Sequence, residues 1–393
     1  MRTLKLTLPI LLLTACLILG LLGGTSSSAD DPASQGRPIT PAGTLVTDVT
    51  TRQTAVGSLP VDLIRSPDKL GPGGEGRYLI SVNSGFGVQF NSTGNRGQQS
   101  LAVIDLNLKP AAVIQNVYFP SPQSVNVGVV FAPRAEPDGS YVLYVSGGFE
   151  NKIWIFRFQA ENRPPITPVS PGPNTTVEAP FIDVSGFAFA ANSSRYNENR
   201  EPVYPTGIAI GRDGNTLFVA NNLGDSLGIV EDLRGTRKLT RIDLRHERNQ
   251  FVYPYGVAVV PAKVYVSLWN DSSVAVIESN KVVTRVAVGR HPTVMLLNPE
   301  RTRLFVANSN DDSVSVIDTA TDKEIERIST RLSEGVPPGN SPEGLALSGD
   351  DLYVANAHSN SVAVIELSDR ARGGSSGEGR STVRGFIPTG QYP

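Results

Sequence analysis

Two histidines and two aspartates near the carboxyl end of the chain are the residues best suited to chemistry. His291 precedes Pro292, His358 follows a Val-Ala-Asn segment, and Asp311 and Asp312 occur between the two histidines. Imidazole and carboxylate are ordinary metal ligands, so these residues could hold a metal if the fold brought them together. No short-range ligand motif supports such a site, and solvated loop residues are the simpler interpretation. We therefore expect no metal and no cofactor.

The elements that would position these residues belong to a repeat. The sequence LFVAN occurs at residues 217–221 and 304–308, LYVAN at 352–356 and the looser VYVS at 264–267. Their starts are separated by 47, 40 and 48 residues, and each copy is followed by a second apolar run such as SVSVID at 313–318. β-Branched and aromatic residues in this pattern predict strands. A strand, turn and strand unit at this spacing excludes helical solenoids and predicts an all-β propeller of four-stranded antiparallel blades.

The repeats resemble the YVTN-repeat β-propellers, which are lactonase-like seven-bladed propellers. The resemblance is carried by PTGIA at 205–209, RDGN at 212–215, PYGVA at 254–258 and PEGLA at 342–346. More divergent copies begin near residues 66 and 137. The resemblance covers residues 45–393, and it implies a ring of blades whose ligands are bound at one loop-rich end.

Six blades are recognisable, and both ends of the repeat region depart from the pattern. Residues 51–57 look like an orphan outer strand of an incomplete seventh blade, and residues 385–393 look like the end of one blade and the start of another. These ends are most similar to the propeller half of bacterial proteins that join a propeller to a phosphoesterase. We expect an incomplete ring, in which residues 51–57 pair with blade six or lie at an unpaired edge and favour self-association.

The loops at one end of the blades, which we call the mouth, contain the candidate ligand-binding residues. Tyr204 and Tyr255 flank the starts of inner strands, where aromatic side chains either stack on a ligand or wedge neighbouring blades together. The asparagines that end the repeated strands can instead bond the backbone of their own turns. The turn at Asp213 should lie at the opposite end. The mouth candidates are Tyr204, Tyr255, Asn270, His291, Asn308, Asp311, Asn356 and His358.

Two insertions interrupt the repeat. The proline-rich stretch from residue 163 to 200 predicts a long irregular loop, and the Gly- and Asn-rich stretch from 85 to 99 predicts a shorter one.

The first 29 residues predict an export signal. Arg2 and Lys5 precede an apolar run at residues 6–22, and Ala29 ends a small-residue cleavage pattern. An uncleaved membrane anchor and a lipoprotein modified at Cys16 stay open as alternatives. Residues 30–44 read as a flexible linker, and we expect a periplasmic or extracellular protein.

The net charge of −2 and the absence of a Lys/Arg cluster argue against binding to nucleic acid. The sequence contains no GxSxG elbow, no HExxH motif and no phosphate-binding loop, so no catalytic residue is predicted. The leading hypothesis is an exported, non-catalytic propeller that binds a macromolecule or a small ligand at its mouth. The alternative is a hydrolase of lactonase or phosphoesterase type. A membrane would be involved only through residues 6–22 or a lipid on Cys16.

Overall fold

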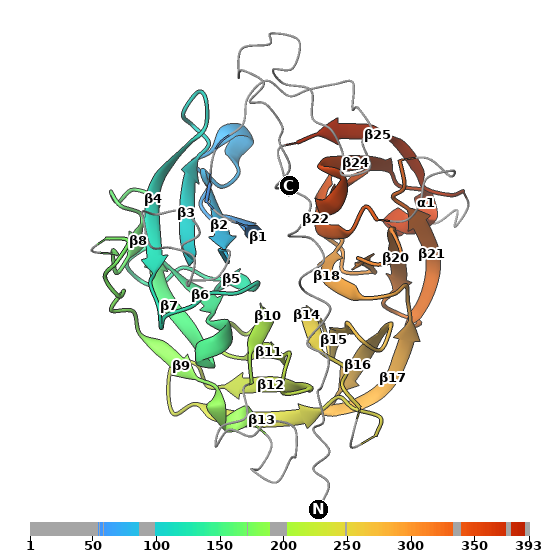
Figure 1. Cartoon of the computed structure of the whole chain (residues 1–393), viewed down its shortest axis with the longest axis horizontal. Coiled ribbons are helices and arrows are strands. Elements are labelled where there is room, and N and C mark those ends of the chain that lie inside the picture. The colour runs from blue at the N-terminus through green and yellow to red at the C-terminus, as the bar shows by residue number, and fades with distance from the viewer. Residues whose placement is uncertain are drawn as a thin grey trace, which may run out of the picture. The chain divides into compact units, whose positions relative to one another are not determined.

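The computed structural model describes residues 54–389 apart from 55, 58, 86–98, 171, 189–202, 248–249, 333–338 and 375–378. The described residues form six antiparallel sheets around a central axis (Figure 1). Within them the α-helical content is the single turn α1 (Asp369–Arg372), beside a few short 3-10 turns. The all-β propeller predicted from the repeat is therefore confirmed.

Five blades have four strands each, in chain order from the axis outward. Blade one contains β1 (Pro60–Arg65), β2 (Tyr78–Asn83), β3 (Gln99–Asp105) and β4 (Ala112–Phe119). Blade three contains β10 (Pro205–Ile210), β11 (Leu217–Asn221), β12 (Ser226–Glu231) and β13 (Lys238–Asp243). Blade four contains β14 (Pro254–Val260), β15 (Lys263–Leu268), β16 (Ser273–Glu278) and β17 (Lys281–Ala287). Blade five contains β18 (Pro292–Leu297), β19 (Arg303–Asn308), β20 (Ser313–Asp318) and β21 (Lys323–Ser329). Blade six contains β22 (Pro342–Ser348), β23 (Asp351–Asn356), β24 (Ser361–Glu366) and β25 (Thr382–Pro388).

Blade two has a fifth strand that the sequence did not predict. Its strands are β5 (Val129–Phe131), β6 (Tyr141–Ser146), β7 (Lys152–Phe158), β8 (Ile166–Thr167) and β9 (Phe181–Asp183). Both β8 and β9 pair with β7, so the expected irregular loop at 163–200 contributes two short outer strands. Glutamine side chains fix the insertion, because Gln115 donates to the carbonyl of Ile166 at 2.7 Å and Gln123 to that of Val177 at 2.8 Å. The rest of that stretch, from 189, and most of the 85–99 insertion lie outside the described residues.

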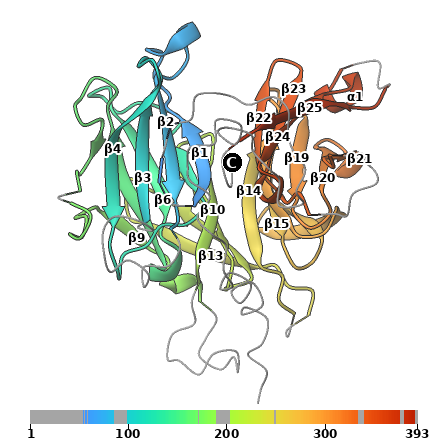
Figure 2. The ribbon, with the colours of Figure 1, turned by 45° about the horizontal axis from the view of Figure 1, so that its top comes forward.

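Neighbouring blades are joined by apolar side chains that alternate between the two faces of each strand. Val274 and Val276 of β16 pack toward blade five, whereas Ala275 and Ile277 of the same strand pack toward blade three. Five such buried clusters join the consecutive blades from one to six. The inner strands line the axis, as Figure 2 shows for β1, β10 and β14.

The boundary between blade six and blade one is looser than the others. Val314 and Val316 of β20 are fully buried, but the equivalent Val362 and Val364 of β24 are only half-buried. Although β1 and β22 are in contact, no buried apolar cluster among the described residues joins these two blades. This face of blade six therefore contributes less burial than its counterpart in blade five.

The expected outer strand at residues 51–57 is not found among its described members. Thr54 donates to the carbonyl of Ala111 at 2.8 Å, and the carbonyl of Val56 accepts from the Asn83 amide at 3.0 Å. These residues contact blade one, and the outermost position of blade six is filled by β25. The pairing with blade six was therefore wrong. Gly57 lies so close to Asn83 that a Cβ at this position would be 2.6 Å from the amide nitrogen of that side chain.

Candidate functional site

The strand register confirms which loops share the mouth. Each inner strand begins opposite the end of its neighbour, as in the pairs Pro205 with Asn221 and Pro292 with Asn308. The turn that contains Asp213 lies beyond the other end of β10. We call that opposite end the base.

The residue before the first proline of the inner strand has a left-handed backbone in five blades. The φ angles are 51° at Leu59, 54° at Tyr204, 47° at Tyr253, 52° at His291 and 52° at Ser341. Positive φ is uncommon for residues other than glycine and costs free energy, so the surrounding structure must impose it.

That backbone is held by acceptors from the preceding blade. The Asn151 side chain accepts from the N–H of Val203 and of Tyr204, both at 3.0 Å. The Asp225 carboxylate accepts from the N–H of Val252 at 2.8 Å and of Tyr253 at 3.1 Å. Asp312 occupies the equivalent position in blade five and accepts from Asn340 at 2.8 Å. In these three cases a side chain of one blade, buried for Asp225 and Asp312, thus sets where the next inner strand starts.

Four polar side chains at the mouth end of the inner strands form the candidate site, which we call the axial cluster: Asp62, Tyr204, Tyr255 and Glu343. Burial, and then the charges of Glu343 and Asp62 and the phenol of Tyr204, raise the pKa of the Tyr255 hydroxyl above its ordinary value. The three groups that act on Tyr255 come from blades one, three and six, so the cluster gathers across the axis. Burial also raises the pKa of Tyr204. Both phenols therefore stay protonated and can donate hydrogen bonds at neutral pH.

Asp62 has the most perturbed carboxyl group of the cluster. It accepts from the N–H of Leu63 at 2.8 Å and also faces the backbone amides of Gly128 and Val129 in blade two. Burial outweighs these hydrogen bonds and raises the pKa of Asp62 to about 6. A carboxyl group with such a pKa can exchange a proton close to neutral pH.

The cluster offers both acceptors and donors. Glu343 accepts from the hydroxyl of Ser341 at 2.9 Å, which orients its carboxylate. In the described part of the chain, the charges that act on the Tyr255 phenol are acidic. Carboxylates and phenols in this arrangement suit a ligand rich in hydroxyl groups or one with a positive charge.

An aromatic row lies beside the axial cluster at the mouth of blades four and five. Phe251 stacks on Tyr253 with ring centroids 6.1 Å apart, and Tyr253 meets the edge of Trp269 at 6.2 Å. The Trp269 ring stacks on His291 at 3.7 Å, with 12° between the planes. Phe251 is 38% exposed, so the row presents an aromatic surface to solvent.

Three of the other predicted mouth residues lie in different surroundings. Asn270 is exposed and donates to the carbonyl of Phe251 at 2.8 Å. Asp311 pairs with Arg290 at 3.3 Å and with Arg327 at 3.5 Å. His358 is exposed in a 3-10 turn (Ala357–Ser359) of blade six.

Two predicted asparagines are fully buried. The Asn308 amide donates to the hydroxyls of Ser313 at 3.0 Å and Ser315 at 2.9 Å. Asn356 donates to the carbonyl of Thr330 at 3.4 Å. Their amides connect strands within and between blades, which favours a structural role.

The described residues contain no group of three or more His, Cys, Asp or Glu side chains placed to bind a metal ion. The histidine and aspartate set near the carboxyl end therefore does not assemble as such a group in this part of the chain.

Sequence reasoning missed Asp62, Glu343 and Trp269. A signal was present, because Asp62 and Glu343 follow the prolines that begin β1 and β22, as Tyr255 follows Pro254 in β14. Counting from each proline would have placed Asp62 and Glu343, like Tyr255, at the mouth end of an inner strand, whereas Trp269 follows β15 and carries no such signal.

No family model and no curated protein sequence matches the chain. Among solved structures, the periplasmic gluconolactonase of Pseudomonas aeruginosa matches with a TM-score of 0.58 and 15% identity, over 91% of this chain and 96% of that one. The chain is a β-propeller. A putative 6-phosphogluconolactonase from Bacteroides uniformis matches with a TM-score of 0.57 and 12% identity, over 88% and 89%. Hydrazine synthase from Kuenenia stuttgartiensis matches with a TM-score of 0.53 and 17% identity, over 88% and 90%. At these identities the likeness concerns the fold of the propeller alone.

Proposed function

We propose that this propeller binds a small polyhydroxylated ligand at the axial cluster. The observation that carries the proposal is that two carboxyl groups, Asp62 and Glu343, and the phenol of Tyr204 all act on the Tyr255 phenol at the mouth. Carboxylates accept hydrogen bonds from ligand hydroxyl groups, and protonated phenols donate to ligand oxygens. The nearby aromatic row adds a surface on which the apolar face of a ring can pack.

A small ligand is favoured over a macromolecule because the polar groups gather on the axis rather than spread over the mouth loops. Binding at the axis uses residues from three or more blades at once. Such a site is held by the rigid inner strands and needs little ordering of loops when the ligand binds.

Hydrolysis of a lactone is the second candidate function, and the pKa of Asp62 favours it. As a general base, Asp62 would take a proton from a water molecule that adds to the lactone carbonyl carbon. The ring C–O bond then breaks, and the leaving oxygen takes up a proton to give a hydroxy acid. The Tyr255 phenol could donate a hydrogen bond to the carbonyl oxygen as negative charge develops there. Two of the structurally similar propellers are described as a gluconolactonase and a putative 6-phosphogluconolactonase.

Calorimetric titration with sorbitol and glucono-δ-lactone, two uncharged polyhydroxylated probes, together with an assay of lactone opening, tests both functions. We expect Tyr255→Phe, which removes a hydrogen-bond donor, and Glu343→Gln, which replaces a charged acceptor by a weaker neutral one, each to weaken binding of either probe by roughly tenfold. Asp62→Asn should abolish lactone opening while leaving part of the binding. Glu247→Gln, an exposed carboxyl group in a mouth loop, is the matched control and should change neither.

The outcomes separate the two functions. Binding without enzyme-dependent lactone opening supports a binding protein alone. Equal affinity of Glu247→Gln and Glu343→Gln would contradict the axial site, and so would the absence of saturable binding to the unmodified protein.

Export to the periplasm or cell exterior is part of the proposal and rests on Arg2, Lys5 and the apolar run at 6–22. Those residues lie outside the described part. Within the described part, no helix is long and apolar enough to span a membrane. Intact-mass measurement of the protein from its native host distinguishes cleavage after Ala29 from lipidation at Cys16 and from retention of the segment.

A further inference from the structure

A second pocket lies at the base, between blades three and four and away from the axial cluster. Its volume is about 310 Å³. The pocket runs from the turn between β10 and β11 to the turn between β16 and β17. Its walls are largely apolar and include Phe218, Ile229, Val259, Val264 and Ile277.

Two arginines beside this pocket pair with no carboxylate in the described part of the chain. Arg212 lines the pocket, is exposed, and forms no side-chain hydrogen bond or ion pair with the described residues. Arg301, from the turn between β18 and β19, donates to the carbonyl of Val259 at 2.6 Å and pairs with no described carboxylate. Because Val259 itself lines the pocket, this contact brings the Arg301 guanidinium to its edge.

The other two charged side chains that line the pocket, Lys263 and Asp213, already bind other groups of the protein. Lys263 pairs with Asp322 at 2.7 Å and also donates to the carbonyl of Thr319. The Asp213 carboxylate accepts from the N–H of Asn215 at 3.0 Å and from the hydroxyl of Thr216 at 2.7 Å. Asp213 therefore closes its own turn instead of pairing with Arg212.

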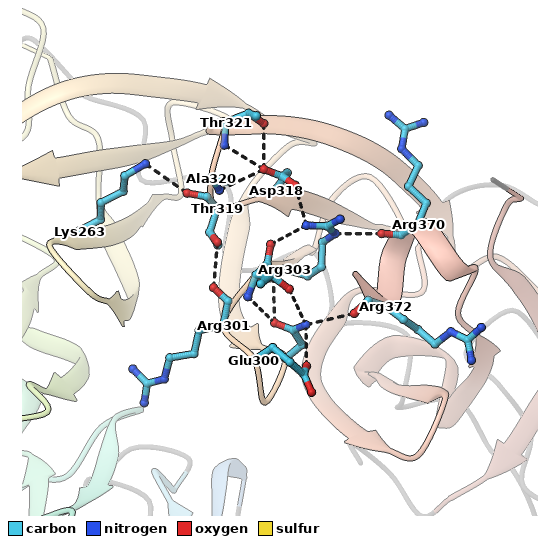
Figure 3. Close-up of polar contacts among 12 residues, drawn as sticks. Lys263, Glu300, Arg301, Arg303, Asp318, Thr319, Ala320, Thr321, Arg370 and Arg372 are labelled. Atoms are coloured by element: carbon cyan, nitrogen blue, oxygen red, sulfur yellow. Dashed lines mark hydrogen bonds and ion pairs between the residues drawn. The ribbon is translucent and has the colours of Figure 1, made fainter. Parts of the chain in front are cut away.

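Arg301 contrasts with its neighbour Arg303. Arg303 pairs with Asp318 at 2.6 Å and donates to the carbonyl of Arg370 at 2.9 Å. Figure 3 shows the Arg301 side chain directed away from this polar network. Burial, and then the like charge of Arg212, lower the pKa of the Arg301 guanidinium, so the two cations are close enough to repel each other.

We propose that this pocket binds an amphipathic organic anion, with its apolar body against the blade walls and its oxyanion between Arg212 and Arg301. Guanidinium groups form paired, charge-assisted hydrogen bonds with carboxylate and phosphate oxygens. An anion placed there would relieve the repulsion between the arginines. An apolar body would cover the part of the wall at Phe218 and Val259, whose side chains are only partly buried. The ligand class differs from the hydroxyl-rich one proposed for the mouth.

Calorimetric titration with octanoate, octyl phosphate and octanol tests the proposal on the folded protein. We expect saturable binding of octanoate or octyl phosphate and weaker binding of octanol, which has the same apolar body without the charge. Tighter binding of octyl phosphate would identify phosphate as the preferred charged group of the ligand, and tighter binding of octanoate would identify carboxylate. Both outcomes support the site. Equal binding of octanol, or no saturable binding of either anion, would overturn it.

Substitution of the two arginines distinguishes binding in this pocket from nonspecific attraction of anions to the protein surface. Arg212→Ala and Arg301→Ala should each weaken anion binding by roughly tenfold or more, because each removes a hydrogen bond to a charged group. Arg134→Ala is the matched control, since Arg134 is an exposed cation in another base turn and its loss changes the net charge equally. Thermal melting of each variant verifies folding. An equal effect of Arg134→Ala and Arg212→Ala would show that the anion is not held by this pocket.

Discussion

The carboxylate of Asp225 in blade three accepts a hydrogen bond from the backbone N–H of Tyr253, at the start of blade four, at 3.1 Å. Asp225 is fully buried, and Tyr253 has the left-handed φ of 47°. The equivalent contact between Asn151 and Tyr204 places a member of the axial cluster. The geometry of the mouth therefore depends on contacts between blades rather than on its loops alone.

Replacement of Asp225 by alanine should destabilise the protein by about 2–4 kcal/mol, because two buried N–H groups lose their acceptor. Asp225→Asn keeps an oxygen at the same place and should cost less. Urea unfolding followed by Trp fluorescence measures the difference, with Trp269 beside Tyr253 as a local probe. Equal stability of the alanine variant and the unmodified protein would show that the contact contributes nothing.

Replacement of Gly207 by alanine should displace the neighbouring inner strand. A Cβ at Gly207 would lie 2.4 Å from the carbonyl oxygen of Tyr255, well inside van der Waals contact. We expect a loss of stability of about 1–3 kcal/mol from overpacking and weaker ligand binding at the mouth. Gly385→Ala is the control, because its Cβ would meet no atom within 4 Å. If both variants melt at the same temperature, the close approach of β10 and β14 is not required.

The loose boundary of blade six predicts unequal costs for the same substitution. Val316→Thr places a hydroxyl in a fully buried site and should cost about 1–3 kcal/mol. Val364→Thr occupies the equivalent place in β24, where the side chain is half-buried, and should cost clearly less. Denaturant unfolding compares the pair. Equal costs would mean that this face of blade six is as tightly covered as that of blade five.

Light scattering of the purified protein tests the self-association expected from the sequence.

Asp62 predicts a specific dependence of stability on pH. Burial raises its pKa from 3.8 to about 6, so the folded chain holds this proton more tightly than the unfolded chain. The stabilisation from protonated Asp62 is complete below about pH 4 and is lost as the pH rises through about 6. Asp62→Asn should therefore be more stable than the unmodified protein at pH 7, by about 1–2 kcal/mol, since the side chain is only half-buried. The difference in stability between Asp62→Asn and the unmodified protein should disappear below pH 4. A constant difference from pH 4 to 8 would contradict the raised pKa.

Much of the fold could be predicted because each blade repeats a local pattern. Strand alternation, the proline that begins each inner strand and the polar turns recur at short range, so they identified all six blades, of which five have the predicted four strands, and the end at which Asp213 lies. The fifth strand of blade two was missed because β8 and β9 depend on Gln115 and Gln123, which reach the insertion from more than fifty residues away in sequence. Within residues 51–57, the described Thr54, Val56 and Gly57 contact blade one and belong to no strand.

The sequence by itself determined the propeller and the mouth location of Tyr204, Tyr255 and His291. Only the tertiary structure decided that Asp62 and Glu343 act on Tyr255, that Asn308 is buried, and that Arg212 and Arg301 lie close enough to repel each other. The physical reason is that a blade's internal pattern is set by nearby residues, whereas closure of the ring sets which side chains converge. Closure brings together side chains of blades one, three, four and six at the mouth and of blades three and five at the base, and no spacing along the chain encodes those distances.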